Sequence, residues 1–330
     1  MHIVKAELLW TRICPLDCHY CGMVTQLRNS RSSSDWRLGM ENLKSLGCRF
    51  VAIYGAEPLA DFDKLPELIR SINECGMDST VITSGVTPAF EKKLRLLHDA
   101  GLRSLTMSHD LCLEDKSSKL KSDRSLEGLT FFQSLGCRDV AVVVTLTRTN
   151  HHLLPEFVTR MSDHGIWTLF DFVHPDRGQE GTKCRGNAVG LKFSAPADLT
   201  ILRGTLDQLI RLKAKGCLVH TSFHFVSTVS RDNFDVLRNF SWNCARELNF
   251  PAWVTINCDG RVFPCDDFQP AAAPFDMTKL YSQWNDFCDY WKPYVARACP
   301  GCCWNTHIDA HAIKANRISI GDYVHGIQTR

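Results

Sequence analysis

Residues 6–21 read AELLWTRICPLDCHYC, a strand-like apolar run that leads directly into three closely spaced cysteines. Cys14, Cys18 and Cys21 are separated by three and then by two residues. Three thiolates on one tight loop can bind one face of an iron–sulfur cube and leave the fourth iron open to another ligand. Zinc is the alternative, but it normally takes four protein ligands, and His19 inside the loop is awkwardly placed as the fourth. The spacing therefore favours iron–sulfur.

From this stretch to about residue 174 the chain repeats a strand followed by a helix. The predicted strands are short runs rich in β-branched and apolar residues, at 6–13, 49–54, 79–83, 104–108, 140–147 and 166–173. Segments with apolar residues at helical spacing lie between them, at 36–46, 65–72, 89–97, 126–135 and 153–161. Because parallel strands need crossover helices, this repeat predicts an α/β fold with a parallel sheet and helices outside it.

The repeat stops beyond residue 174, where a glycine-rich loop and then a helical stretch at 198–215 follow. Cysteine and aromatic residues become denser from Ser241 onward. We therefore predict three parts, namely a barrel domain at 1–190, a helical connection at 191–240 and a C-terminal domain at 241–330.

The composition narrows the class of protein. The chain has 330 residues, of which 44% are hydrophobic and 22% charged, and this excludes a disordered or fibrous protein. A net charge of +2 disfavours nucleic acid as a partner, and no apolar run approaches the roughly 18 residues of a membrane helix. The first ten residues lack a signal-peptide core. We expect a cytoplasmic protein, so that its 16 cysteines are free, catalytic or metal-bound.

Motifs at the predicted strand ends resemble those of the radical S-adenosylmethionine (radical SAM) superfamily. Its signature is this three-cysteine loop with an aromatic residue before the third cysteine, here Tyr20. The second strand ends in Gly55-Ala56-Glu57-Pro58, which is similar to the family's Gly-Gly-Glu-Pro motif, with Ala56 replacing a glycine. The third strand ends in Thr83-Ser84-Gly85 where the family often has Thr-Asn-Gly, and the fourth ends in Ser108-His109-Asp110, which matches Ser-x-Asp.

The resemblance implies a partial (βα)6 barrel that binds S-adenosylmethionine and a [4Fe–4S] cluster held by the three cysteines. A reductant such as flavodoxin or ferredoxin would supply an electron, and the resulting 5′-deoxyadenosyl radical would remove hydrogen from a substrate carbon. Arg148, just past the fifth strand, is expected to bind the methionine carboxylate, with an ordinary exposed arginine as the alternative. The expected cofactor contacts are Tyr20, Gly55, Ala56, Glu57, Ser84, Ser108, Asp110 and Arg148.

A second set of cysteines lies near the C-terminus, at Cys244, Cys265, Cys299 and Cys302. The first two flank a predicted hairpin that has Asp259-Gly260 at its turn. This pattern resembles the twitch form of the SPASM extension of radical SAM enzymes. The resemblance implies one auxiliary [4Fe–4S] cluster with these four ligands, which would relay electrons or shape the pocket. A structural zinc site is the alternative.

A cysteine near the substrate can donate a hydrogen atom. The chain resembles the neomycin C epimerase type of sugar and aminoglycoside epimerases, chiefly through a cysteine ahead of the second auxiliary ligand. The resemblance implies Cys258 as the donor and Cys303 as the alternate, while inert packing is the other interpretation. If the substrate radical instead gives its electron to the auxiliary cluster, the reaction is the dehydrogenation of an aminocyclitol or sugar alcohol.

The substrate is indicated weakly. Seven acidic and three basic residues lie between 244 and 290, a balance that would attract a cationic aminoglycoside, although a solvated acidic face is the commoner explanation. Asp171, His174 and Asp176 lie at or after the end of the sixth strand, where barrel active sites collect, and are predicted substrate contacts. Peptide modification is the other enzyme class, disfavoured because 13 residues ahead of Cys14 leave no room for a peptide-recognition domain. We expect an epimerase of antibiotic biosynthesis.

Overall fold

The strands predicted from the repeat form one continuous sheet. The computed structural model describes residues 3–111, 115–173, 190–191, 193, 196–231, 244–265, 274–298 and 304–317. Within them, eight strands are ordered β6-β5-β4-β3-β2-β1-β7-β8. Neighbouring strands from β6 to β7 are parallel, and β7 and β8 are antiparallel. The strands are β1 (Lys5–Leu9), β2 (Phe50–Tyr54), β3 (Asp78–Thr83), β4 (Ser104–His109), β5 (Asp139–Leu146), β6 (Trp167–Phe172), β7 (Trp253–Asn257) and β8 (Val262–Phe263).

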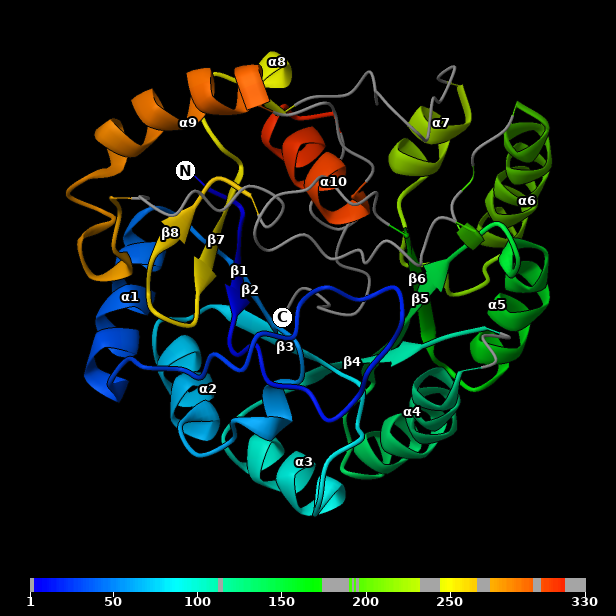
Figure 1. Ribbon diagram of the computed structural model, residues 1–330, viewed down its shortest axis with the longest axis horizontal. Coiled ribbons are helices and arrows are strands. Elements are labelled where there is room, and N and C mark those ends of the chain that lie inside the picture. The colour runs from blue at the N-terminus through cyan, green and yellow to red at the C-terminus, as the bar shows by residue number, and fades with distance from the viewer. Residues whose placement is uncertain are drawn as a thin grey trace.

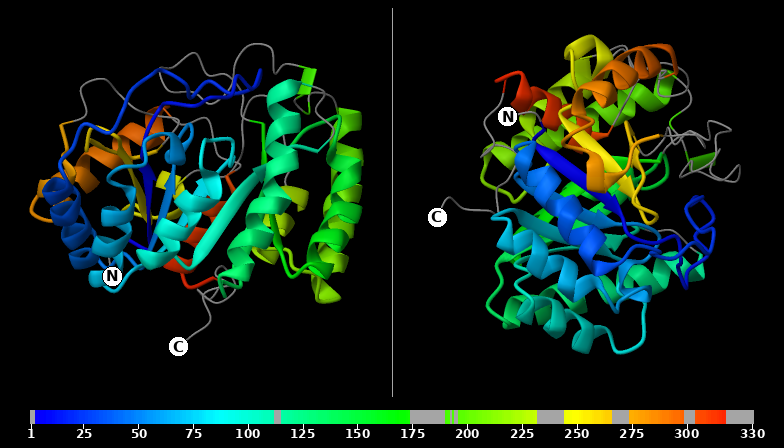
Figure 2. Two further views of the ribbon diagram at one scale, coloured as in Figure 1. Left: turned by 90° about the horizontal axis from the view of Figure 1, so that it is seen from below. Right: turned by 90° about the vertical axis from the view of Figure 1, so that its left-hand side faces the viewer.

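Helices cover the outer face of the curved sheet, as Figures 1 and 2 show. Helices α1 to α5 each connect one parallel strand to the next, the crossover that parallel pairing requires. The helices are α1 (Ser33–Ser45), α2 (Leu65–Glu74), α3 (Phe90–Asp99), α4 (Lys116–Ser134), α5 (Leu154–Asp163), α6 (Pro196–Ala214), α7 (Phe223–Arg231), α8 (Cys244–Glu247), α9 (Trp284–Ala298) and α10 (Asn305–Lys314). Short 3-10 turns lie at Pro58–Ala60, His151–Leu153 and Met277–Lys279.

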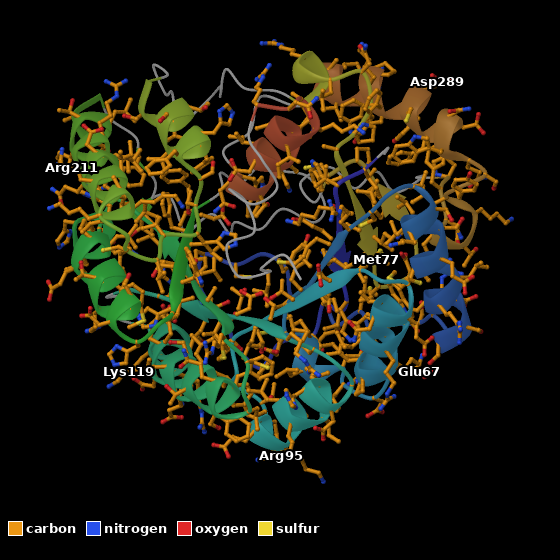
Figure 3. All side chains as sticks on the ribbon, turned by 180° about the vertical axis from the view of Figure 1, so that it is seen from behind. Glu67, Met77, Arg95, Lys119, Arg211 and Asp289 are labelled. Atoms are coloured by element: carbon orange, nitrogen blue, oxygen red, sulfur yellow. The ribbon has the colours of Figure 1, made fainter. Side chains whose placement is uncertain are left out.

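The outer faces of these helices are polar. Glu67 on α2, Arg95 on α3 and Lys119 on α4 are exposed and point away from the sheet (Figure 3). None of the helices in the described part of the chain combines the length and the apolar character needed to span a bilayer.

The two faces of β1 show how the core is divided. Trp10 packs on Trp36 of α1, with ring centroids 5.3 Å apart, and Leu8 is buried on the same face of the strand. Lys5 and Glu7 alternate with these residues, so they face the interior of the curved sheet, where they form a buried ion pair. The apolar core therefore lies between sheet and helices, while polar side chains occupy the inner face.

The predicted (βα)6 arrangement is confirmed, and two element ends differ from the prediction by four residues or more. The first strand ends at Leu9 rather than at residue 13, because the Arg12 amide bonds to the Leu27 carbonyl instead of to a neighbouring strand. Helix α4 begins ten residues earlier than the predicted 126–135, because the Asp115 side chain caps the amide of Ser118.

The predicted hairpin forms and joins the barrel sheet. β7 pairs in parallel with β1 along its whole length, from Lys5 opposite Trp253 to Leu9 opposite Asn257. Gly260 at the turn has φ of +80°, and a Cβ there would lie 2.5 Å from Nε of Arg31. The hairpin therefore extends the six-stranded barrel by two strands, which the sequence did not predict. The predicted division at residues 190 and 240 stays a prediction.

Helix α10 lies on the side where the ring of outer helices is open (Figure 1). Its Asn305 side chain donates to the Phe170 carbonyl of β6 at 2.7 Å. His307 approaches Glu7 of β1, with Nε2 and Oε2 3.3 Å apart, and Asp309 accepts from Ser222 at 2.5 Å. This helix therefore bridges β6 and β1, the two ends of the six-stranded repeat.

Candidate active site

A cavity of about 230 Å³ lies at the carboxyl ends of the parallel strands. Its walls come from the three-cysteine loop after β1, from the ends of β2 to β6, from Lys121 of α4 and from Trp304 just ahead of α10. The lining includes the predicted site residues Cys14, Cys18, Tyr20, Cys21, Gly55, Ala56, Ser84, Ser108 and Asp171. Residues from eight separate parts of the sequence thus meet at one cavity.

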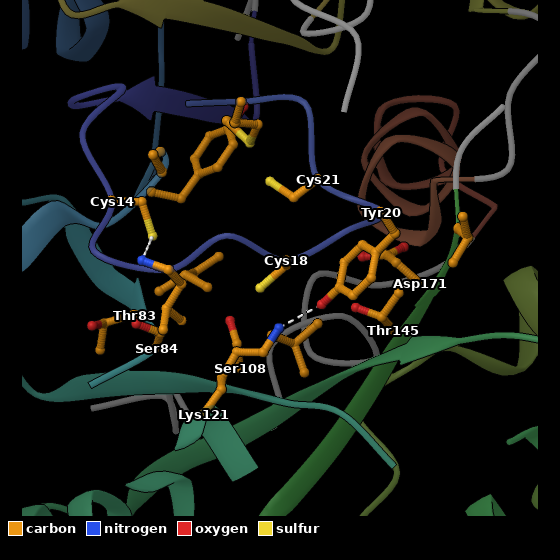
Figure 4. Close-up of a pocket in the computed structure, with 18 of the residues that line it drawn as sticks. Cys14, Cys18, Tyr20, Cys21, Thr83, Ser84, Ser108, Lys121, Thr145 and Asp171 are labelled. Atoms are coloured by element: carbon orange, nitrogen blue, oxygen red, sulfur yellow. Dashed lines mark hydrogen bonds between the residues drawn. The ribbon is translucent and has the colours of Figure 1, made fainter. Parts of the chain in front are cut away.

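The sulfur atoms of Cys14, Cys18 and Cys21 face the same space (Figure 4). The Leu16 amide donates to the Cys14 sulfur at 3.4 Å, and the Cys21 amide donates to the Cys18 carbonyl at 2.9 Å, which closes the loop into a tight turn. Burial raises the pKa of Cys14 to about 12 and that of Cys18 to about 11, so both carry protons in the metal-free chain. A bound metal centre would displace these protons. Three cysteines that line one cavity, one of them with an amide donor to its sulfur, suit a [4Fe–4S] cluster.

Tyr20 fixes this loop to the barrel wall. Its hydroxyl donates to Oδ2 of Asp110 at 2.7 Å, and the ammonium of Lys121 lies 2.5 Å from the same carboxylate oxygen. Lys121 also donates to the Tyr20 oxygen (Figure 4). Burial, with the charge of Asp110, raises the pKa of Tyr20 well above its usual value, so the hydroxyl keeps its proton.

Sequence reasoning missed Lys121. A signal for it exists, because α4 buries Ser118, Lys121, Ser125 and Gly128 at helical spacing, and Lys121 is the charged member of this inward stripe. A lysine on the core-facing side of a helix needs a partner, since a buried charge without one is costly.

Glu57 lies behind the cavity wall rather than in it. Its side chain is fully buried, and one carboxylate oxygen accepts from the Leu59 amide at 3.0 Å and the Thr83 hydroxyl at 2.5 Å. The other accepts from the Ser84 amide at 2.8 Å and from the Ser84 hydroxyl. Four donors fill the acceptor sites of the carboxylate, so it organises the ends of β2 and β3. A direct contact of Glu57 with S-adenosylmethionine stays a prediction, and it would require one of these bonds to open.

Position 55 has no room for a side chain larger than that of glycine. Its φ is +150°, and a Cβ would lie 2.4 Å from the Thr11 carbonyl oxygen. The Ala56 amide donates to the same carbonyl at 2.9 Å, and the Glu57 amide donates to that of Ile13 at 2.9 Å. The Gly55-Ala56-Glu57 segment is thus held against the start of the cysteine loop.

The remaining predicted cofactor and substrate contacts have different positions. Ser108 lines the cavity, whereas Asp110 is buried behind it and its Oδ1 has no hydrogen-bond partner in the described part of the chain. Asp171 lines the cavity and accepts from the Asn305 amide of α10 at 3.3 Å. Arg148 is exposed, and its guanidinium donates to the Gly190 carbonyl at 3.2 Å. It is not among the described lining residues.

The predicted auxiliary site is described in part. Cys244 begins α8 and is buried, and Cys265 follows β8 and is half-buried. Five predicted residues lie outside the described residues, namely His174, Asp176, Cys299, Cys302 and Cys303. The auxiliary cluster and the roles of these residues therefore stay predictions.

Cys258 follows β7 and is 2% exposed. Its carbonyl accepts from the Ser30 amide at 3.2 Å. Burial raises the pKa of its thiol to about 11, so the sulfur keeps its hydrogen. It is not among the described residues that line the cavity.

Known proteins are similar to this chain in sequence and in fold. Residues 8–165 match the model of the Radical SAM superfamily. PqqA peptide cyclase from Rhodopseudomonas palustris is 30% identical over 156 residues, which cover 45% of this chain and 41% of that protein. The segment 8–165 is therefore similar to radical SAM proteins, and the chain spans about two fifths of the length of this relative.

Two solved structures extend the likeness of fold over most of the chain. Streptococcus suis SuiB bound to S-adenosylmethionine has a TM-score of 0.65 at 18% identity, covering 90% of this chain and 68% of SuiB. The structure of anSMEcpe with bound AdoMet and a Cp18Cys peptide has a TM-score of 0.63 at 12% identity, covering 98% of this chain and 88% of that protein. At these identities the likeness defines the fold, which confirms the predicted radical SAM architecture.

Proposed function

We propose that the chain is a radical SAM enzyme in which Cys14, Cys18 and Cys21 hold a [4Fe–4S] cluster and the adjoining cavity holds S-adenosylmethionine. The observation that carries this proposal is that the three sulfurs and the strand-end motif residues line one cavity. When bound, the cluster and S-adenosylmethionine supply a 5′-deoxyadenosyl radical, which removes hydrogen from a substrate carbon. The electron comes from a reductant of the flavodoxin or ferredoxin class.

The chain's own residues position the cofactor and exclude water. Thr83 and Ser84, both hydrogen-bonded to Glu57, line the cavity at the end of β3. Apolar side chains form much of the remaining wall, among them Leu16, Met23, Ile82, Phe172, Val173 and Trp304. A wall of this kind keeps water away from a reactive species.

A peptide is the substrate class that we propose. PqqA peptide cyclase, a relative of the barrel segment, acts on a peptide by its name. Among the described lining residues, the charged side chains are Lys121 and Asp171, and both make contacts with other parts of the chain. A mainly apolar wall suits an amino-acid side chain better than it suits a polycation.

Epimerisation of a sugar or aminoglycoside is the second candidate. The feature in its favour is Cys258, which lies at the carboxyl end of β7 beside the end of β1 and keeps its hydrogen, as a hydrogen-atom donor must. Its position outside the described cavity lining counts against it. Dehydrogenation through an auxiliary cluster held by Cys244, Cys265, Cys299 and Cys302 is the remaining alternative.

Iron analysis after anaerobic reconstitution tests the cluster sites. Two clusters predict about eight irons per chain and one predicts about four. Cys18→Ala should lower the iron content, whereas Cys75→Ala, at the end of α2, should leave it unchanged. An iron content in Cys18→Ala equal to that of the wild type would exclude the proposed ligand.

The substrate class is tested by turnover in deuterated water with a peptide library and an aminoglycoside panel in parallel. If the enzyme modifies peptides, peptides of the library should change in mass, and Cys258→Ala should produce the same mass changes. Epimerisation predicts one deuterium at an inverted aminoglycoside carbon and its loss in Cys258→Ala. A deuterated aminoglycoside with no peptide product would reverse our order of preference.

A further inference from the structure

A buried group of three side chains ties the cysteine loop to the barrel, and the proposed function does not use it. It consists of Tyr20 from the loop, Asp110 just past β4 and Lys121 on α4. The side chains of Lys121 and Asp110 are 8% and 0% exposed. We refer to these three residues as the Lys121 group.

The Lys121 group connects three elements through short contacts. The ammonium of Lys121 lies 2.5 Å from Oδ2 of Asp110 and 5.1 Å from the centroid of the Tyr20 ring. Tyr20 lies between Cys18 and Cys21, so a shift of its ring would move the backbone of both cysteines. The segment that carries two of the three sulfurs is therefore fixed by α4 and by the end of β4.

Lys121 also places a positive charge at the cavity. It is the cationic side chain among the described lining residues, while Asp110 lies behind the wall. Cys18 lines the same cavity as Lys121. A charge at this wall, shielded from water, acts on a group bound to the Cys18 sulfur.

We propose that Lys121 is a positioning residue for the cluster, which holds the Cys18–Cys21 segment through Tyr20 and favours the more negative, reduced state through its charge. The inference rests on the proposed function. It concerns the equilibrium between the oxidised cluster and the cluster that has gained one electron from an external reductant. A fixed positive charge stabilises the state that carries the additional negative charge.

The test compares Lys121→Met with Lys119→Met, since Lys119 is exposed on the same helix (Figure 3). Reconstituted proteins are titrated with dithionite and redox dyes, and the reduced cluster is measured by electron paramagnetic resonance. At the wild-type midpoint potential, Lys121→Met should show a ratio of reduced to oxidised cluster lower by about tenfold, a shift of about 59 mV. Lys119→Met and Lys121→Arg should stay within about twofold of the wild type, because the first keeps the ion pair and the second keeps the charge.

A second variant separates the charge from folding, because Lys121→Met leaves Asp110 buried without a partner. The double variant Lys121→Met with Asp110→Asn removes both charges and should bind wild-type amounts of iron. Its ratio of reduced to oxidised cluster should lie between that of the wild type and that of Lys121→Met. An unchanged ratio in either iron-loaded variant would overturn the role of Lys121. A wild-type chain that binds no cluster would instead contradict the proposed function.

Discussion

At the scale of single residues, the site depends on buried groups that do not touch the cavity. Glu57 receives four hydrogen bonds and Asp110 anchors both Tyr20 and Lys121. Their positions were predicted from motifs, but their partners were not. Motif spacing defines where a strand ends, whereas the direction of a side chain depends on its neighbours in three dimensions. Glu57 and Asp110 therefore act here as positioning residues.

Glu57→Gln should destabilise the fold. The amide group must present a donor where two protein donors already converge, so one or more buried polar groups lose their partner, at a cost of about 1–3 kcal/mol. Glu91→Gln, on the exposed side of α3, is the matched control and should change the free energy of unfolding by less than about 0.5 kcal/mol. Urea denaturation measures both. Equal stability of the two variants would show that the four bonds do not form.

We expect Gly55→Ala to lower the stability of the fold much more than Ala56→Gly at the neighbouring position. Gly55→Ala places a Cβ 2.4 Å from the Thr11 carbonyl, so the backbone must shift, and we expect a loss of at least about 2 kcal/mol. Ala56→Gly restores the more common motif and should cost no more than about 1 kcal/mol. Thermal unfolding compares the two variants, and a larger loss for Ala56→Gly would contradict the geometry at Gly55.

At the scale of elements, α10 shows why part of the fold could not be predicted. Asn305, His307, Asp309 and His311 are each about 2–3% exposed, although such residues usually lie on surfaces. The partners of Asn305, His307 and Asp309 lie on β6, on β1 and ahead of α7, far away in the sequence. Residues at helical spacing share a face of a helix, but the spacing does not reveal that this face of α10 is buried.

Asp309 makes the docking of α10 sensitive to pH. Burial raises the pKa of Asp309 to about 7, above the usual value near 4, so the folded state holds the proton more tightly than the unfolded state does. The stability from this group is present below about pH 4 and is lost as the pH rises to about 7. The pKa values of two nearby groups are shifted downward instead. Burial lowers the pKa of His311 to about 3, and Lys5 and His307 hold the pKa of Glu7 well below its usual value despite burial.

A difference between variants isolates the contribution of Asp309. In Asp309→Asn the titrating proton is absent, so the stability of the wild type relative to this variant should fall by about 1 kcal/mol per pH unit between pH 4 and 7. Asp286→Asn, exposed on α9, should show no such slope. Urea unfolding at several pH values measures this difference, and parallel curves for wild type and Asp309→Asn would contradict the burial of this carboxyl group.

The β7–β8 hairpin is a second element whose place in the fold could not be predicted from the sequence. The dipeptide Asp259-Gly260 predicts the turn correctly, because Gly260 adopts φ of +80°. The parallel pairing of β7 with β1 joins strands about 250 residues apart, and no local pattern specifies it. Turn chemistry is local, whereas the choice of an edge strand is not.

At the scale of the whole molecule, the C-terminal elements complete the barrel. β7 covers the edge of β1, and α10 connects β1 to β6. The same helix directly follows Trp304, which lines the cavity, and Cys299, Cys302 and Cys303 come shortly before Trp304 in the sequence. We therefore expect any cluster held by these cysteines to stand near the substrate rather than in a separate domain.

The formation of 5′-deoxyadenosine tests the central claim most directly. Anaerobically reconstituted protein is incubated with S-adenosylmethionine and dithionite, and the product is measured by liquid chromatography with mass detection. We predict 5′-deoxyadenosine from the wild type and from Cys75→Ala, and none above background from Cys18→Ala. Wild-type protein with a full complement of iron that forms no 5′-deoxyadenosine would contradict the assignment of this cavity to radical SAM chemistry.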